Sequence, residues 1–148
     1  MFFFLIILFI IIGEFYLKNQ MEGRLSHSSN ISCFQGKILL RKYHNKGAFL
    51  NIFEKKTKFL HFISILFTLI ISLLFLFTLF QKGNFILKLG LSLLLGGAFS
   101  NTYDRLSRGY VIDYFSFKTP FPKLNKIVFN ISDFCIMIGS LILVLSRN

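Results

Sequence analysis

The chain has 148 residues, of which 54% are hydrophobic, and it carries a formal net charge of +11 from 17 Lys and Arg against 6 Asp and Glu. Soluble domains of this length usually have less apolar sequence, and here the apolar residues come in long blocks, which excludes an ordinary soluble domain. In a membrane protein the basic excess points to anionic lipid headgroups, and no helix-turn-helix, zinc-finger or RNA-binding pattern supports nucleic-acid binding.

Four apolar segments predict membrane-spanning helices, at about residues 1–17, 59–80, 85–103 and 127–145. A helix needs about 20 mainly apolar residues to cross a bilayer, and the second segment meets this length cleanly. The third and fourth reach it by including polar residues, and the first is slightly short. Because the first segment has neither a basic leader nor an A-x-A-like cleavage site, we expect a retained span rather than a signal peptide. The predicted fold class is mainly α, a four-transmembrane-helix membrane protein.

The connections between these segments differ in length. Residues 81–84, QKGN, form a turn, so the second and third spans are expected to make an antiparallel helical hairpin. Residues 18–58 and 104–126 are long loops. The GKILLRKY stretch at 36–43 alternates in a way compatible with short strands, and two prolines in the second loop prevent a continuous helix there. We expect one membrane-embedded domain over residues 1–148 with a small β-containing loop domain.

An even number of spans places both long loops on one side of the membrane. The polar residues at the span ends then share that side: Glu14, Lys18, Asn101, Asp104, Arg105, Asn130 and Asp133. The same side holds 14 of the 17 basic residues, since only Lys82, Lys88 and Arg147 lie opposite. Taken alone, the positive-inside rule therefore places this side in the cytoplasm.

Ionisable residues inside spans are costly to bury and are usually functional. Three pairs each share one helix face by their spacing: Glu14 with Lys18, Asn101 with Arg105, and Asn130 with Asp133. The first pair has the i, i+4 spacing of an ion pair on a helix surface. Each of the other two presents an amide beside an ionic group, and an amide can orient a charge without adding one.

A further carboxylate, Asp113, lies just beyond the third span in YVIDYF, an alternating stretch typical of a strand. If this stretch folds back against the fourth span, Asp113 can meet Asp133, and the two carboxyl groups would share a proton and titrate as a pair. One could then act as a base toward water and the other as an acid toward the attacked carbonyl. The structural alternative is an Asp that caps a helix or pairs with Arg105, Arg108 or a lysine.

Other chemistries have less support. The sequence holds no GxSxG, HExxH, P-loop or GxGxxG motif and no plausible Ser/His/Asp set. Its two cysteines, Cys33 and Cys135, are far apart with no CxxC, and its three histidines are scattered, so we expect neither a disulfide nor a metal site.

Four stretches follow one another along the chain: EFYLK at 14–18, NKGAF at 45–49, GGAFSNTYDRLSRGYVIDYF at 96–115 and FNISDF at 129–134. They resemble, in the same order, the D-x-x-x-K, NxGAAF, GGAxGNxxDRxxxGxVxDF and FNxADxxI blocks of signal peptidase II, the lipoprotein signal peptidase. This family comprises bacterial four-span aspartic peptidases. The resemblance covers about residues 14–145, and both aspartate-containing blocks are long and specific.

The resemblance implies that Asp113 and Asp133 are the catalytic aspartates and that Asp104 is structural. Supporting or substrate-binding roles would fall to Asn101, Arg105, Asn130, Asn45, Glu14 and Lys18. No metal or cofactor is implied. The substrate would be a prolipoprotein whose lipobox cysteine carries diacylglycerol, cut just before that cysteine. The partners would be lipidated prolipoproteins and membrane lipids, and we expect a monomer.

The resemblance also implies a multi-pass protein of the bacterial cytoplasmic (inner) membrane with its active site near the extracytoplasmic face. This is opposite to the orientation that the charge count gives. We favour the orientation of the family, because a loop that folds into its own small sheet can tolerate basic residues outside the cell.

The chain departs from the family pattern at several positions. Glu14 replaces the usual Asp, Ser132 replaces Ala, Phe134 replaces a small residue, and NKGAF lacks one alanine before Phe49. Phe134 directly follows Asp133 and could narrow the site. The departures keep an alternative open, a catalytically weak or inactive relative acting as an accessory or binding membrane protein. A small transporter or channel is disfavoured, because no charged path crosses the middle of the spans.

Overall fold

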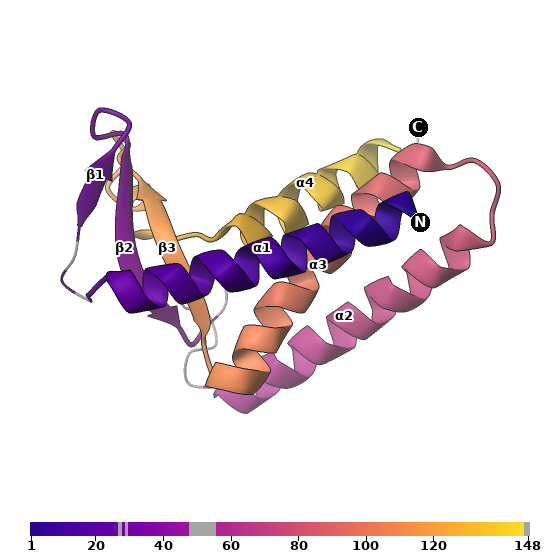
Figure 1. Ribbon diagram of the computed structural model, residues 1–148, viewed down its shortest axis with the longest axis horizontal. Coiled ribbons are helices and arrows are strands. Elements are labelled where there is room, and N and C mark those ends of the chain that lie inside the picture. The colour runs from indigo at the N-terminus through magenta and orange to yellow at the C-terminus, as the bar shows by residue number, and fades with distance from the viewer. Residues whose placement is uncertain (27, 29, 48–55, 147–148) are drawn as a thin grey trace.

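The computed structural model describes residues 1–26, 28, 30–47 and 56–146. The elements in this part of the chain are α1 (Phe2–Arg24), β1 (Ile31–Cys33), β2 (Ile38–Asn45), α2 (Thr57–Leu79), α3 (Phe85–Arg108), β3 (Val111–Phe117), the 3₁₀ helix η3 (Leu124–Lys126) and α4 (Ile131–Leu145). The long helices run alongside one another, and the strands stand across one end of the bundle (Figure 1). The predicted mainly α class with a small β-containing part is confirmed.

The helices differ in whether they can cross a bilayer. Within the described residues, α1, α2 and α3 are long and apolar enough to do so, with 23, 23 and 24 residues. The helix α4 is apolar but has 15 residues, fewer than the about 20 that a crossing needs. The structure therefore supports three membrane spans, and the predicted fourth span stays a prediction.

The central helix is α3, which packs against α1, α2 and α4. Where α1, α2 and α3 meet, the apolar core consists of Ile7, Ile71, Phe75, Leu91, Leu94 and Leu95. In contrast, α1 and α2 turn large apolar side chains outward, and Phe9 is 80% exposed. An apolar surface of this extent suits a lipid environment rather than water.

Small residues allow α3 to approach its neighbours closely. A Cβ added to Gly97 would lie 2.5 Å from the Ser132 carbonyl oxygen of α4. A Cβ added to Gly96 would lie 2.9 Å from the Ile10 side chain of α1. Gly96 and Gly97 thus permit close packing of α3 against α1 and α4.

The three strands form an antiparallel sheet in the order β1-β2-β3. In β2, Tyr43 pairs with Asp113 of β3 and Asn45 pairs with Val111, after an irregularity in the register that follows Leu40. Both alternating stretches that predicted strands, GKILLRKY and YVIDYF, contribute to these elements. The sheet therefore joins the two long connections and carries Asn45 and Asp113 into the same region.

Two local features direct β3 toward α4. At the end of α3, Gly109 has a φ of 81°, a left-handed conformation that favours glycine, and its N–H bonds to the Arg105 carbonyl at 3.1 Å. The chain then reverses into β3. Near its other end β3 pairs with the segment before α4, where Phe129 N donates to Phe115 O at 2.7 Å. This is the fold-back against the fourth helix on which a meeting of Asp113 and Asp133 depends.

Candidate active site

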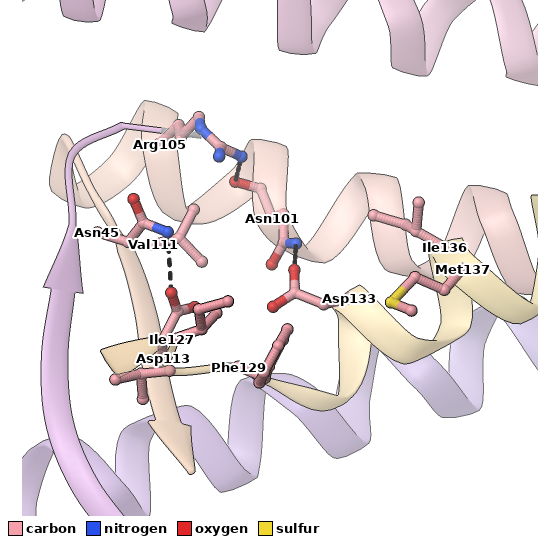
Figure 2. Close-up of a pocket in the computed structure, with 11 residues that line it drawn as sticks. Asn45, Asn101, Arg105, Val111, Asp113, Ile127, Phe129, Asp133, Ile136 and Met137 are labelled. Carbon is pink, nitrogen blue, oxygen red and sulfur yellow. Dashed lines mark hydrogen bonds between the residues drawn. The ribbon is translucent and has the colours of Figure 1, made fainter. Parts of the chain in front are cut away.

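A cavity of about 200 Å³ lies where the end of α3, β3 and the start of α4 come together. Figure 2 shows its side chains converging from these elements and from the end of β2. The polar lining residues are Asn45, Asn101, Arg105, Asp113 and Asp133, and the rest are apolar: Val111, Ile127, Val128, Phe129, Ile136 and Met137. Five of the predicted site residues thus line one cavity.

Asp113 is placed in the cavity by β3 and is 1% exposed. Its Oδ2 accepts a hydrogen bond from Asn45 Nδ2 at 2.9 Å, and its Oδ1 accepts one from Asn130 Nδ2 at 2.7 Å. Burial raises the pKa of Asp113 to about 7, with the negative charge of Asp133 adding to the effect and the two amide donors opposing it. The group therefore holds a proton over much of the range in which an ordinary Asp is ionised.

Asp133 is held by the N-terminus of α4. Its Oδ2 accepts from the Asn130 backbone N–H at 3.1 Å, while the Asn130 side chain accepts from the Asp133 N–H at 3.0 Å. This reciprocal pair is a capping box. The Oδ1 of Asp133 accepts a hydrogen bond from Asn101 Nδ2 at 2.9 Å (Figure 2). The helix N-terminus and these donors offset part of the cost of burying the negative form of Asp133.

Each asparagine in this arrangement has its amide orientation fixed by a second partner. Asn45 Oδ1 accepts from Gly47 N at 3.0 Å, and Asn101 Oδ1 accepts from Lys18 Nζ at 2.9 Å. In Asn130 the Oδ1 is taken by the capping box. Because every carbonyl end is occupied, the NH₂ ends are left to donate to the two carboxyl groups.

Lys18 and Glu14 lie behind the cavity in a buried network rather than in it. Both side chains are 1% exposed, and the ammonium lies 3.4 Å from Glu14 Oε2 and 2.9 Å from Asp104 Oδ2. Lys18 Nζ also donates to Ser100 Oγ at 3.0 Å. The interpretation as an ion pair on a helix surface is therefore wrong in one respect: the spacing and the pairing hold, but α3 and β3 cover the pair.

The Glu14 carboxylate joins α1 to β3 and α4. Its Oε1 accepts from the Tyr114 hydroxyl at 2.6 Å, and its Oε2 accepts from Ser132 Oγ at 2.8 Å and Ser132 N at 3.2 Å. Burial and the Glu14 charge raise the pKa of Tyr114, so the phenol keeps the proton that it donates. Ser132, which stands in place of the family's usual Ala, is thus a direct partner of Glu14, which replaces the usual Asp.

The arginines near Asp113 and Asp133 bind groups other than these two carboxylates. Arg108 Nε lies 3.2 Å from Asp104 Oδ1, and Asp104 Oδ2 also accepts from Ile112 N at 3.3 Å. Asp104 thus fastens the turn between α3 and β3, as its expected structural role requires. Arg105 donates to the carbonyl oxygens of Asn101 and Gly47, at 3.3 and 3.4 Å.

The alternative interpretation of the two aspartates, as helix caps or ion-pair partners, holds only in part. Asp133 does cap a helix, through Asn130. Within the described ranges, however, no ion pair joins either aspartate to Arg105, Arg108 or a lysine, since the pairs of Arg108 and Lys18 go to Asp104 and Glu14. Both carboxyl groups therefore face the cavity without an ion-pair partner among the described residues.

Phe134 points away from the cavity. Its ring stacks on Phe115 with centroids 5.5 Å apart and packs edge-on against Phe117 and Phe129. The expectation that it narrows the site is wrong, because the helical turn after Asp133 directs it to this aromatic cluster. The departure in NKGAF, which lacks one alanine before Phe49, lies at positions outside the residues that the structure describes.

Two contributors were not foreseen. Tyr114 follows Asp113 in a strand, so it points to the opposite face, toward α1. Ser132 was noted only as a departure, and nothing in its spacing from Glu14 indicated a contact. Among the described residues, no three His, Cys, Asp or Glu side chains are grouped so that they could hold a metal ion.

Comparisons with known families, protein sequences and solved structures agree with one another. A family model described as signal peptidase (SPase) II matches residues 5–147. A lipoprotein signal peptidase of Lactiplantibacillus plantarum is 29% identical over 130 residues, covering 88% of this chain and 83% of that protein. One of Clostridium tetani is 36% identical over 124 residues, covering 82% and 76%. A bacterial membrane enzyme structure determined by the in meso method at 2.3 Å resolution is 21% identical, covers 98% of this chain and 86% of that chain, and has a TM-score of 0.83, which shows a shared fold.

Proposed function

This chain belongs to the signal peptidase II family, and we propose that it is an aspartic endopeptidase that removes signal peptides from diacylglyceryl-modified prolipoproteins, cutting just before the lipidated cysteine. The observation that carries the proposal is the cavity that Asp113 and Asp133 share, where each carboxyl group is held by amide donors and has no ion pair within the part of the chain that the structure describes. Two such carboxyl groups can divide the acid and base roles that peptide hydrolysis needs.

The surroundings of the two groups suggest which role each takes. Asp133, at the N-terminus of α4, is the anion and takes a proton from the attacking water. Asp113, whose pKa is raised to about 7, donates its proton to the oxygen of the attacked carbonyl. The resulting tetrahedral diol collapses when Asp133 passes the proton that it took from water to the amide nitrogen and Asp113 takes back a hydroxyl proton, which breaks the peptide bond and restores both groups. Loss of the Asp113 proton above about pH 7 would lower the rate.

Arg105 is the residue that we expect to contact the substrate backbone. Its guanidinium lines the cavity and is bonded to two carbonyl oxygens at long distances, and its Nε has no hydrogen-bond partner among the described residues. Free donor capacity beside the dyad suits a peptide carbonyl, which accepts without adding charge. Asn45, Asn101 and Asn130 orient the two carboxyl groups, and Glu14 and Lys18 support them from behind.

The proposed membrane arrangement has four spans, with the bilayer thinned locally around the short helix α4, and the chain acting as a monomer. The cavity lies near the extracytoplasmic face, and both termini lie in the cytoplasm. Acyl chains of the substrate would then remain in the bilayer while the bond to be cut enters the cavity. Labelling of a cysteine introduced at Lys46, beside Asn45, should succeed from outside the cell, and labelling only after cell lysis would refute this orientation.

The alternative of an inactive relative loses part of its basis. Glu14 is accommodated by bonds to Ser132 and Tyr114, and Phe134 lies in an aromatic cluster. Neither departure removes a contact of Asp113 or Asp133.

The test is cleavage by the purified protein of a synthetic precursor peptide whose lipobox cysteine carries diacylglycerol, with product masses read by mass spectrometry. We expect a cut on the amino side of the modified cysteine and no cut in the same peptide without lipid. Cleavage of both peptides at equal rates would contradict the substrate assignment, and cleavage of neither would favour the inactive relative.

A further inference from the structure

Residues 118–126, between β3 and α4, form a loop that is held by its own side chains. Asn125 Oδ1 accepts from Thr119 N at 2.7 Å, and Asn125 Nδ2 donates to Thr119 O at 2.9 Å. The 3₁₀ helix η3 closes the loop, with Leu124 N donating to the carbonyl of Phe121 at 3.0 Å. The 118–126 loop is therefore a fixed shape, prepared before any contact is made.

This fixed loop turns apolar side chains outward. Phe121 is 66% exposed and stands between Pro120 and Pro122, whose rings restrict the backbone on both sides. Leu124 is 45% exposed. Contact with an apolar phase outside the protein would remove the exposed Phe121 ring from water.

The charges around Phe121 are all of one sign. Lys118, Lys123 and Lys126 are exposed, and the sequence has no Asp or Glu between Asp113 and Asp133. Lysines grouped around a protruding apolar side chain are typical of segments at the headgroup level of a bilayer, where the ring enters the interface and the ammonium groups meet phosphates.

The position of the loop fits such a contact. Lys126 is followed closely by Ile131, the first residue of α4, and α4 exposes apolar side chains outward, with Leu141 57% exposed. In Figure 1 the sheet stands across the end of the helical bundle, and the β1–β2 turn and the end of β3 lie together at its upper tip, to one side of α1. Lys118 N donates to Lys37 O at 2.8 Å, which joins the 118–126 loop to this projecting part of the sheet.

We propose that the 118–126 loop binds an anionic phospholipid surface, with Phe121 among the headgroups and Lys118, Lys123 and Lys126 on the phosphates. The contact holds the free end of the sheet on the bilayer. It is separate from the cavity and does not depend on peptide hydrolysis. A phospholipid surface is favoured over a peptide partner because the loop offers a protruding apolar ring surrounded by cations.

The chain contains no Trp, so F121W gives a single interfacial fluorophore. The variant would be reconstituted in vesicles of phosphatidylcholine alone and of phosphatidylcholine with phosphatidylglycerol. In the anionic vesicles we expect blue-shifted emission, protection from iodide, and quenching by lipids brominated near the glycerol backbone. Adding K118Q, K123Q and K126Q to F121W should lower the ratio of inserted to exposed fluorophore by roughly fivefold per lysine.

A matched control separates the effect of the lysines in the 118–126 loop from the effect of the protein's net charge. In F121W, the pair K123Q/K126Q should weaken the protection from iodide, whereas K56Q/K58Q, which removes two exposed lysines at the start of α2, should leave it unchanged. Equal iodide access in anionic and neutral vesicles would overturn the proposal. So would equal effects of the two pairs, or protection that appears only on adding a lipobox peptide, which would assign the loop to substrate.

Discussion

Replacement of Lys18 by Met tests the buried network behind the cavity. Met is similar in length but has no charge, and the change removes contacts from Lys18 Nζ to Asp104 at 2.9 Å, Asn101 at 2.9 Å, Ser100 at 3.0 Å and Glu14 at 3.4 Å. Asp104 keeps its pair with Arg108, whereas Glu14 loses the one ion pair that it makes among the described residues. Breaking a buried pair by removing one partner typically costs about 3–5 kcal/mol, so we expect a loss of that size in the free energy of unfolding.

The assay is reversible unfolding of the purified protein in detergent, and Lys88→Met is the matched control. Lys88 is also buried in α3, but its ammonium donates only to the Gln81 carbonyl at 2.6 Å among the bonds of the described residues, so its loss should cost about 1.5–3 kcal/mol. The double variant K18M/E14Q should be more stable than the sum of the single changes predicts, because the neutral amide introduced by E14Q leaves no uncompensated charge. A Lys18→Met loss no larger than that of Lys88→Met, or strict additivity, would refute the reasoning.

Three further predictions concern the dyad and the packing beside it. Because the folded protein raises the pKa of Asp113 from 3.8 to about 7, the free energy of unfolding should fall as the pH rises between these values and then level off, and Asp113→Asn should remove that slope in a pH series of unfolding curves. Asn45→Ala removes a donor that stabilises the anion of Asp113, so the alkaline limb of the cleavage rate should move to higher pH; an unchanged limb would exclude this role. Gly97→Ala places a Cβ against the Ser132 carbonyl and should destabilise the protein by about 1–3 kcal/mol in thermal unfolding, whereas Gly13→Ala, with open space around it, should not.

The sequence was informative wherever function or membrane insertion depends on local pattern. Apolar blocks located the long helices, and alternation located β2 and β3. The helices continue past the apolar blocks, however: α1 runs to Arg24 and α3 to Arg108. Hydropathy detects only the part of a helix that lies in lipid, and Gly109, with its left-handed φ, ends α3 instead.

The contacts of the site depend on tertiary packing and could not be read from spacing. That Lys18 turns the Asn101 amide toward Asp133 requires α1 to lie against α3. That Ser132 bonds to Glu14 requires the close approach of helices more than a hundred positions apart in the chain. Local spacing identified Asn130 with Asp133 correctly as neighbours on one face, because a capping box is formed within a single helical turn.

The central claim is that Asp113 and Asp133 together hydrolyse the peptide bond. Its most direct test is the initial rate of cleavage of the diacylglyceryl precursor by Asp113→Asn and Asp133→Asn, with Glu22→Gln as a control that removes a carboxylate outside the cavity. Each Asn variant should unfold cooperatively in detergent and lose at least about 10²-fold in rate, while the control keeps the wild-type rate. Full activity in either folded Asn variant would contradict the account.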